Sequence, residues 1–434
     1  MQGYPDSDRA TKDKLEVYSI KTGELVTNTY YNVHFSENGP RQVIATKPKN
    51  YRPENALEQV GDIAVITSKE KGSSAPHAIH ADNCSGLVMQ NVTLYGSNSF
   101  GFFETDCSGS KYVSCVVDRR PIEDDIQPRE HRRMRSLTAD GFHSKHAPIG
   151  PSFFGCVSRY NGDDGIAING HYHILTTNDG PVFRVVGKQG REPNLSVGDV
   201  VELVSYTGER TENATIKAIE HGPALTDEEK QFLKAQRFNG NVQSTRQATH
   251  VHLVTLDREV DLPFGSLIAS ANRIGNGFEI RNCTLGPNRS RGLVVKASDG
   301  VISGNQFIDN WGQAIKLAPE YAWLEAGSGS NVTISDNSIT GCRDAAIAIY
   351  AYGGNGSAAP AGAHNDIRII DNSISSSTNP AIAVTSTRGL TLHNNKIQDP
   401  ENSGLAPWIR NRFSRNQDPD LEIYLDTQSV TFGK

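Results

Sequence analysis

Three aspartates carry the clearest chemical signal in the sequence. Asp140 and Asp164 are 24 positions apart (164 minus 140), each is followed by glycine and an apolar residue, and Asp163 directly precedes Asp164. Carboxylates that lie close together cannot all ionise freely, so the pKa of at least one should rise. A protonated carboxyl beside an ionised one is the pair that cleavage of a glycosidic bond needs. The alternatives are that these aspartates cap turns or bind a structural Ca²⁺.

A short strand pattern recurs along the chain, and it is the element that must position these aspartates. Each copy alternates apolar and polar residues and ends in asparagine; the copies lie at 87–92, 278–282, 301–305, 332–337, 367–372 and 390–395. Two of the intervals between asparagines are 23 residues (305 minus 282 and 395 minus 372). Strands this short, repeating without hairpin turns, predict an all-β fold. We expect a right-handed parallel β-helix whose asparagines form a ladder at one corner.

A second strand in each coil indicates which side chains face outward. With Phe142 and Ile166 facing inward, alternation places on the outer face His143, Lys145, Asn169, Lys296 and Lys316. Asp140 and Asp164 occupy the corner before this strand, and adjacent coils lie roughly 4.8 Å apart. The aspartates are therefore expected to stand side by side. The same register points the side chain of Glu104 toward the core, where a carboxylate is not expected. We interpret this as an irregularity of its coil.

Residues 171–270 lack the repeat. Alternating apolar residues at 182–186, 197–204 and 252–256 predict antiparallel strands, and hence an inserted β-barrel-like module. Thr226 and Glu229 form a capping box before one short helix. The predicted organisation is an N-terminal segment that leads into the helix (1–60), the first part of the β-helix (61–170), the inserted module (171–270) and the second part of the β-helix (271–434).

The outward columns and the neighbouring loops supply candidate substrate-binding residues. The strands and their corners contribute His143, Lys145, Asn169, Arg291, Lys296 and Lys316, and the loops contribute Arg135, Trp323 and Glu325. These residues either line a sugar cleft or form a solvated charged face that balances the carboxylates. Cys115, Cys156 and Cys283 each follow the ladder position, so we expect them to stack as buried apolar side chains.

Composition excludes several classes of function. The chain has 434 residues, with 43 Lys and Arg against 49 Asp and Glu and a formal net charge of −6. This charge argues against binding to nucleic acid or to an anionic membrane, and no apolar run is long enough to span a bilayer. The six cysteines lack the spacing of a zinc site, so we expect neither a metal nor a cofactor. The start of the chain has no signal-peptide core, and we interpret the chain as the mature form of a secreted, extracellular or periplasmic, protein.

The order of these landmarks resembles that of glycoside hydrolase family 110. The segments concerned are 134–143, 162–166, the inserted module with 198–200, 288–293 and 323–327, so that the resemblance runs from about Gly61 to Cys342. It implies an inverting, exo-acting α-1,3-galactosidase on a β-helix with an inserted barrel, acting on an oligosaccharide or polysaccharide. It also implies that catalysis lies at Asp140, Asp163 and Asp164. Ala167 and Asn169 depart from the asparagine and histidine that are usual in the family, which implies altered recognition of the sugar.

Three functions are compatible with these residues. The leading hypothesis is an inverting glycoside hydrolase, with Asp163 or Asp164 as the acid and Asp140 as the base. The second is a polysaccharide lyase or epimerase on a uronate, whose basic residues abstract a proton while the aspartates hold Ca²⁺. The Asp-Asp pair also resembles the polygalacturonase family, which acts on an acidic polysaccharide. The third is a non-catalytic glycan-binding β-helix. The cations predict an acidic or sulfated glycan, unless they only offset the carboxylates.

Overall fold

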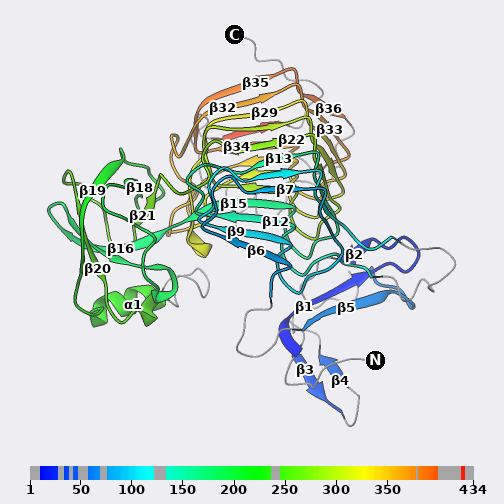
Figure 1. Cartoon of the computed structure of the whole chain (residues 1–434), viewed down its shortest axis with the longest axis horizontal. Coiled ribbons are helices and arrows are strands. Elements are labelled where there is room, and N and C mark those ends of the chain that lie inside the picture. Colours follow the sequence, from blue (N-terminus) through cyan, green and yellow to red (C-terminus); the bar gives the residue numbers. More distant parts are fainter. Residues whose placement is uncertain are drawn as a thin grey trace.

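The computed structural model describes residues 10–27, 34–38, 43–46, 57–68, 76–121, 133–235, 245–377, 380–398 and 422–425. Within these ranges the chain forms a parallel β-helix, with a β-barrel at its side and a small antiparallel sheet near the N-terminus (Figure 1). The all-β fold class predicted from the repeat is confirmed. The described ranges contain one α-helix, of nine residues, and none of their helices combines the length and apolarity needed to cross a membrane.

Three sheets run along the β-helix, and each coil gives one strand to each sheet. The sheet that carries the aspartate corner is called the site sheet; it contains β6 (Ile79–Asp82), β9 (Phe102–Thr105), β12 (Phe142–Lys145), β15 (Ile166–His171), β24 (Leu293–Val295), β27 (Ile315–Leu317), β31 (Ile347–Ile349) and β34 (Ile382–Thr385), with β37 (Glu422–Leu425) added antiparallel. The second sheet contains β7 (Val88–Gln90), β10 (Lys111–Val113), β13 (Ser152–Phe154), β22 (Glu279–Arg281), β25 (Gly300–Ser303), β29 (Ser330–Ser335), β32 (His364–Ile370) and β35 (Thr387–His393). The third contains β8 (Thr93–Leu94), β11 (Val116–Val117), β14 (Val157–Ser158), β23 (Thr284–Leu285), β26 (Gln306–Ile308), β30 (Ser338–Thr340), β33 (Ser373–Ser375) and β36 (Lys396–Gln398).

The register of the site sheet agrees with the predicted alternation. Phe142 pairs with Ile166 and Ile166 with Leu293, all in the buried core, while Lys145 pairs with Asn169 on the outer face. Glu104 faces inward as the alternation requires, but its coil is regular. The buried carboxylate accepts a hydrogen bond of 2.8 Å from the hydroxyl of Tyr112, which provides a polar partner inside the helix. The predicted irregularity was wrong.

The asparagine ladder exists, but two of the residues assigned to it lie one position too early. Asn305, Asn337, Asn372 and Asn395 are stacked and joined by amide hydrogen bonds of 2.9 to 3.1 Å. Asn91 and Asn282 instead have φ of +57° and +55°, which places them at the left-handed corner just before the ladder position. Asparagine tolerates this backbone conformation as well as the ladder position. The ladder position itself is taken in earlier coils by cysteines: the backbone N–H of Cys283 donates to Asn305 at 2.9 Å.

The cysteines at this position are buried. Cys115, Cys156 and Cys283 stack in consecutive coils, with relative exposures of 0 to 1%. Each of the six cysteines is a thiol in the structure. The prediction that these side chains pack as apolar groups agrees with their place in the core, although they occupy the ladder position and do not follow it.

Removing one rung of the ladder should weaken the β-helix. The side-chain oxygen of Asn337 accepts from the backbone and side chain of Asn305, and its Nδ2 donates to Ile302 and Asn372. Asn337→Ala leaves several buried polar groups without partners, so we expect a loss of about 2–4 kcal/mol. Thermal and urea unfolding measure the effect, with Ser338→Ala on the exposed side of β30 as the control. Equal stability of the two variants would show that the ladder does not hold the coils together.

The inserted module is a closed antiparallel barrel that leaves the site sheet after β15. Its strands are β16 (His173–Asp179), β17 (Val182–Val186), β18 (Val200–Val204), β19 (Ala214–His221), β20 (His252–Leu256) and β21 (Leu267–Ser270). The helix α1 (Asp227–Ala235) begins at the predicted capping box, in which Thr226 and Glu229 bond each other's backbone N–H at 2.7 and 3.2 Å. One apolar cluster contains barrel residues such as Ile174 and Leu267 together with Ala348 of β31, so the barrel packs on the β-helix.

The N-terminal strands form two small antiparallel sheets, one of which contacts the loops around the aspartates. They are β1 (Ala10–Tyr18), β2 (Leu25–Thr27) and β5 (Ile63–Ser68) in one sheet, and β3 (His34–Glu37) with β4 (Val43–Thr46) in another. The buried carboxylate of Glu16 in β1 pairs with Arg135 at 3.0 Å and with Arg289 at 3.2 Å. The N-terminal sheet is thereby tied to the loops that surround the aspartates.

Candidate active site

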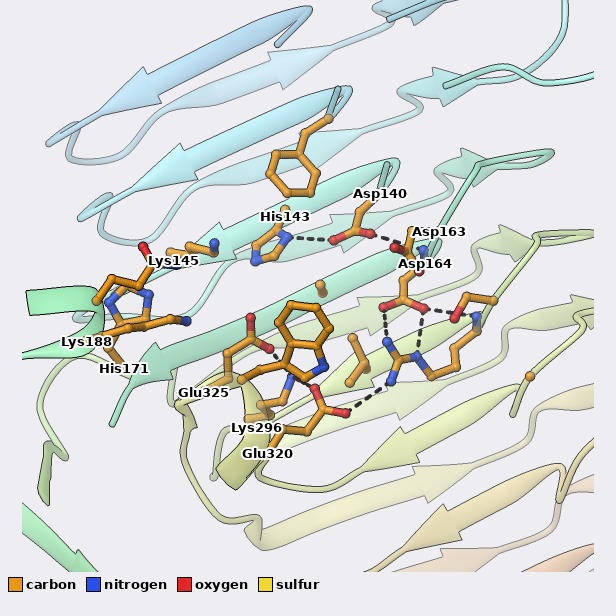
Figure 2. A pocket seen from close by; sticks show the side chains of 18 of the residues that line it. Asp140, His143, Lys145, Asp163, Asp164, His171, Lys188, Lys296, Glu320 and Glu325 are labelled. Carbon is orange, nitrogen blue, oxygen red and sulfur yellow. Dashed lines mark hydrogen bonds and ion pairs between the residues drawn. The ribbon is translucent and has the colours of Figure 1, made fainter. Parts of the chain in front are cut away.

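A cavity of about 620 Å³ lies between the outer face of the site sheet and the barrel. The three aspartates line one end of it, and residues of the loop after β17, among them Lys188, line the other end (Figure 2). The segment between β27 and β29 supplies Glu320, Trp323 and Glu325. Trp323 is 52% exposed in this lining, so its indole face is available to stack on a sugar ring.

Asp140 and His143 share one proton. Nε2 of His143 lies 2.9 Å from Oδ1 of Asn169, whose Nδ2 donates to the carbonyl of Gly170. Because this amide oxygen only accepts, Nε2 carries a hydrogen and Nδ1 of a neutral ring is an acceptor. Nδ1 lies 2.6 Å from Oδ2 of Asp140, so a proton must lie between them. Burial, and then the charge of Asp164, raises the pKa of Asp140 to about 8, while burial holds the pKa of His143 well below its usual value. At neutral pH the proton therefore rests on Asp140.

Asp164 is held by Arg291 through both of its oxygens. Oδ1 accepts from the backbone N–H and from Nε of Arg291 at 3.0 and 2.7 Å, and Oδ2 accepts from Nη2 at 2.7 Å. Burial alone would lower the pKa of Arg291, but Asp164 and Glu320 raise it well above the usual value. The N–H of Asp164 donates to Oδ1 of Asp140 at 3.1 Å, which joins the two aspartates across adjacent coils.

A glycine after each aspartate allows the coils to approach at this corner. A Cβ added to Gly165 would lie 2.5 Å from the carbonyl oxygen of Gly292 in the next coil. Real Cβ atoms essentially never come this close to another heavy atom, so a larger residue would push the coils apart. The glycines that follow Asp140 and Asp164 are thus part of how the sequence sets the spacing of the carboxylates.

Of the three aspartates, Asp163 has the side chain most exposed to the cavity. Its side chain is 32% exposed, against 7% for Asp140 and 4% for Asp164. Nη2 of Arg289 lies 3.3 Å from Oδ1 of Asp163. One oxygen from each of the three aspartates lies within 4.8 Å of the others. The three carboxylates thus form a single group with one exposed member.

The aspartate group could also hold a divalent cation. Ca²⁺ takes six to eight oxygen ligands. In this group, however, His143 and the N–H of Asp164 engage Asp140, while Arg291 engages both oxygens of Asp164. The arrangement is better suited to proton transfer than to a Ca²⁺ cage.

Most of the predicted substrate-binding cations are paired with carboxylates. Lys296 Nζ lies 2.8 Å from Glu325 and 3.2 Å from Glu320, and Lys316 pairs with Glu320 as well. Burial alone would raise the pKa of Glu325, but Lys296 and then Lys188 lower it to about 2. Burial alone would lower the pKa of Lys296, but Glu320 and Glu325 raise it above the usual value. These groups form an ion-pair network in the wall of the cavity.

Two lysines at the barrel end of the cavity lack such carboxylate partners. Lys145 and Lys188 make no ion pair with any residue in the described ranges, and both line the cavity (Figure 2). Burial, opposed by the attraction of Glu325 and aided by the neighbouring charge of Lys145, lowers the pKa of Lys188 to about 8. Nζ of Lys145 lies 5.8 and 5.6 Å from the ring centres of Phe100 and Phe103. This end of the cavity therefore has two lysines without a carboxylate at ion-pair distance in the described ranges.

The structure brings together most of the predicted site residues. The cavity lining includes Asp140, His143, Lys145, Asp163, Asp164, Arg291, Lys296, Trp323 and Glu325. Three predicted residues lie outside the lining. Asn169 is buried beneath His143 and orients its ring; Lys316 is buried against Glu320; and Arg135 points to Glu16 in the N-terminal sheet. Their assignment as direct substrate ligands is corrected for this reason.

Sequence reasoning missed several groups of the lining. Glu320 binds three cations of the network, and its place four residues after Lys316 was the available signal. Lys188 and His171 come from the start of the barrel, where no repeat indicates which way a side chain points. Burial, and then His146, holds the pKa of His171 far below its usual value, so its ring is neutral.

Comparisons with known proteins agree with the fold and give a local similarity to a carbohydrate enzyme. A family model described as "Right handed beta helix region" matches residues 267–358. The chain is 42% identical over 60 residues to alpha-1,3-galactosidase B of Bacteroides thetaiotaomicron, which is 14% of this chain and 10% of that protein. The chain thus spans a small part of that relative.

Two solved structures match this chain at low identity and low TM-score. The A-module of a mannuronan C-5 epimerase of Azotobacter vinelandii has 12% identity and a TM-score of 0.33, over 74% of this chain and 54% of that one. A tailspike protein of a Pseudomonas phage has 11% identity and a TM-score of 0.18, over 60% and 47%. The chain is a right-handed β-helix protein with a short stretch similar to an α-1,3-galactosidase.

Proposed function

We propose that the protein is an inverting, exo-acting glycoside hydrolase that removes a terminal α-linked, galactoside-like sugar. The observation that carries the proposal is the group of three carboxylates in one cavity, with one exposed member and two buried members fixed by His143 and Arg291. The resemblance to glycoside hydrolase family 110 and the local similarity to a galactosidase support the substrate class.

In this proposal the exposed carboxylate is the acid. Asp163 reaches the cavity, and a bound sugar would exclude water from it, which favours the protonated form of a carboxyl group. The proton on Asp140 points to His143, away from a glycosidic oxygen, so Asp140 is assigned to hold the water and the ionised Asp164 to accept its proton. A covalent intermediate is disfavoured, because the side chains of Asp140 and Asp164 are only 7% and 4% exposed and would act on the sugar through a water.

The test of the proposal is a substrate panel. Aryl α- and β-glycosides and α-linked oligosaccharides are incubated with the full chain, and products are separated by chromatography. We expect release of a single terminal sugar from α-galactoside-like substrates, and no internal fragments. Internal cleavage would contradict the exo-acting assignment, and the absence of any release across the panel would contradict the hydrolase.

The two lysines without ion-pair partners at the barrel end support an anionic group on the glycan. Lys145 and Lys188 are placed to face a carboxylate or sulfate next to the terminal sugar. Of the cations that suggested this from the sequence, Arg291, Lys296 and Lys316 are committed to carboxylates. The proposal of an anionic glycan therefore rests on Lys145, which the sequence indicated, and on Lys188, which it did not.

Substitution of these two lysines should affect substrate binding more than turnover. We expect Lys145→Met and Lys188→Met each to raise KM about tenfold, with little change in kcat, because each removes roughly 1.4 kcal/mol of charge interaction. KM of the unaltered protein should also rise with ionic strength. Lys111→Met, on the second sheet away from the cavity, is the control. Unchanged KM values in both variants and no salt effect would indicate a neutral substrate.

A second candidate function is favoured by the pKa of Lys188. A lysine with a pKa of about 8 in a cavity can abstract a proton, as a lyase or epimerase on a uronate requires. Such an enzyme would form an unsaturated or epimerised product, which ultraviolet absorbance and NMR detect. Activity of this kind that survives Asp163→Asn and is lost in Lys188→Met would replace the hydrolase.

A further inference from the structure

The barrel carries three histidines on one face of two neighbouring strands. His221 in β19 pairs directly with His252 in β20, and His250 precedes His252 by two residues, which places it on the same face. The ring centres lie 5.1 to 5.2 Å apart in all three pairs. One nitrogen from each ring lies within 4.8 Å of the others. The pairing of β19 with β20 therefore makes a triangle of imidazoles.

A carboxylate closes this triangle. Oε1 of Glu192 lies 3.0 Å from Nε2 of His250, and Oε2 lies 2.6 Å from Nε2 of His252. The side chain of His252 is 7% exposed, and its buried Nε2 makes no hydrogen bond of acceptable geometry. The carboxylate of Glu192 therefore contacts two of the three imidazoles. The hydroxyl of Thr249 lies 3.1 Å from Nδ1 of His250 and leaves Nε2 to face the group.

We propose that His221, His250, His252 and Glu192 form a binding site for a divalent transition-metal ion of the zinc class. Three imidazoles and one carboxylate are ligands that Zn²⁺ accepts in tetrahedral geometry. Bonds of about 2.0 Å put neighbouring nitrogens about 3.3 Å apart. The rings need only small rotations to close to that spacing, and the exposed side chains of His221 and Glu192 permit them. Thr249 would accept the hydrogen of Nδ1 and orient the His250 ligand.

The site differs from the aspartate group in chemistry and in place. Its nitrogen ligands favour Zn²⁺ over Ca²⁺ or Mg²⁺, whereas the aspartates offer oxygens alone. Glu192 also lines the active cavity, on the same loop as Lys188 and Gln189. A metal ion that binds Glu192 would therefore fix this loop, and with it the barrel wall of the cavity, without touching the aspartates.

The experiment is a Zn²⁺ titration of the full chain, without a polyhistidine tag and after removal of metals with a chelator. Calorimetry is expected to show one Zn²⁺ per chain with a Kd of the order of 1 µM or tighter, and the Tm should rise with Zn²⁺ as binding to the folded state requires. Co²⁺ in place of Zn²⁺ should give the strong visible absorption of a tetrahedral ion. His221→Ala and His250→Ala, both outside the core, should each weaken binding at least about tenfold.

Two further variants locate the ion. His393→Ala, an exposed histidine of β35, and Asp163→Asn should bind Zn²⁺ as the unaltered protein does. If binding is absent, or if it persists unchanged in His221→Ala and His250→Ala, the site does not exist. Loss of binding in Asp163→Asn would place the ion at the aspartates and overturn the proposal. None of these readings depends on glycosidase activity, so they test the metal site separately from the proposed function.

Discussion

Asp163→Asn is expected to fold normally and to lose at least about three orders of magnitude in kcat. The change keeps the shape of the side chain and removes the acid that protonates the leaving group. Asp140→Asn and Asp164→Asn should lose activity to a similar degree, because each removes a carboxylate from the pair that holds the water. Steady-state kinetics on the best substrate of the panel measure all three. Near-normal kcat in any one variant would remove that residue from the mechanism, and a protein that only binds glycans would show no turnover to lose.

Asp140→Asn also provides its own control for folding. The new amide can donate to Nδ1 of His143 and accept from the N–H of Asp164, as the protonated carboxyl does. Because the pKa of Asp140 is raised in the folded state, the folded protein binds more protons than the unfolded one between about pH 4 and pH 8. Stability from this group therefore falls as pH rises through that window. The asparagine variant has no carboxyl group to deprotonate at this position and does not lose this stability as pH rises. Its Tm should therefore exceed that of the unaltered protein at pH 8 and match it near pH 4.

Lys296→Met is expected to destabilise the protein by about 3–5 kcal/mol. The ammonium is 1% exposed and pairs with Glu325 and Glu320, so its loss leaves carboxylate charge in a buried site. The folded pKa of Glu325 is about 2, and its stabilising effect is present above the unfolded pKa near 4.3 and lost as pH falls towards 2. Urea unfolding should therefore show the largest deficit above about pH 5 and a smaller one at pH 3.

Lys145→Met is the matched control for this prediction. Lys145 has no ion pair within the described part of the chain, so its loss should change stability by less than about 1 kcal/mol. The two lysines thus separate a structural role from a substrate-binding role. A stable Lys296→Met protein with a raised KM would show instead that Lys296 binds the substrate. It would also show that the ion pairs of Lys296 with Glu320 and Glu325 do not contribute to stability.

The β-helix could be predicted from the sequence because strand alternation allows one consistent register. Once Phe142 and Ile166 face the core, Asp140 and Asp164 must share a corner and Lys145 must face outward. The errors come from residues that suit two neighbouring positions. Asparagine fits both the ladder and the left-handed turn before it, so Asn282 was assigned one position too early.

The partners of the site residues could not be predicted from the sequence. Strand alternation predicts that Lys296 and Lys316 point outward from the β-helix. Only the fold shows that the segment after β27 brings Glu320 and Glu325 back to pair with them and bury them. Within the barrel no repeat indicates the register. Lys188 and the three histidines of β19 and β20 are brought to their places by strand pairings between residues far apart in the chain.

Proton NMR of the sugar released in the first minutes of reaction tests the central claim most directly. A glycoside hydrolase with Asp163 as acid and a water held by Asp140 and Asp164 should release the β-anomer first from an α-linked substrate, and Asp163→Asn should release none. Initial release of the α-anomer would show a covalent intermediate and contradict the assigned roles. A product with an unsaturated ring, or equal release by Asp163→Asn, would contradict the hydrolase built on these three aspartates.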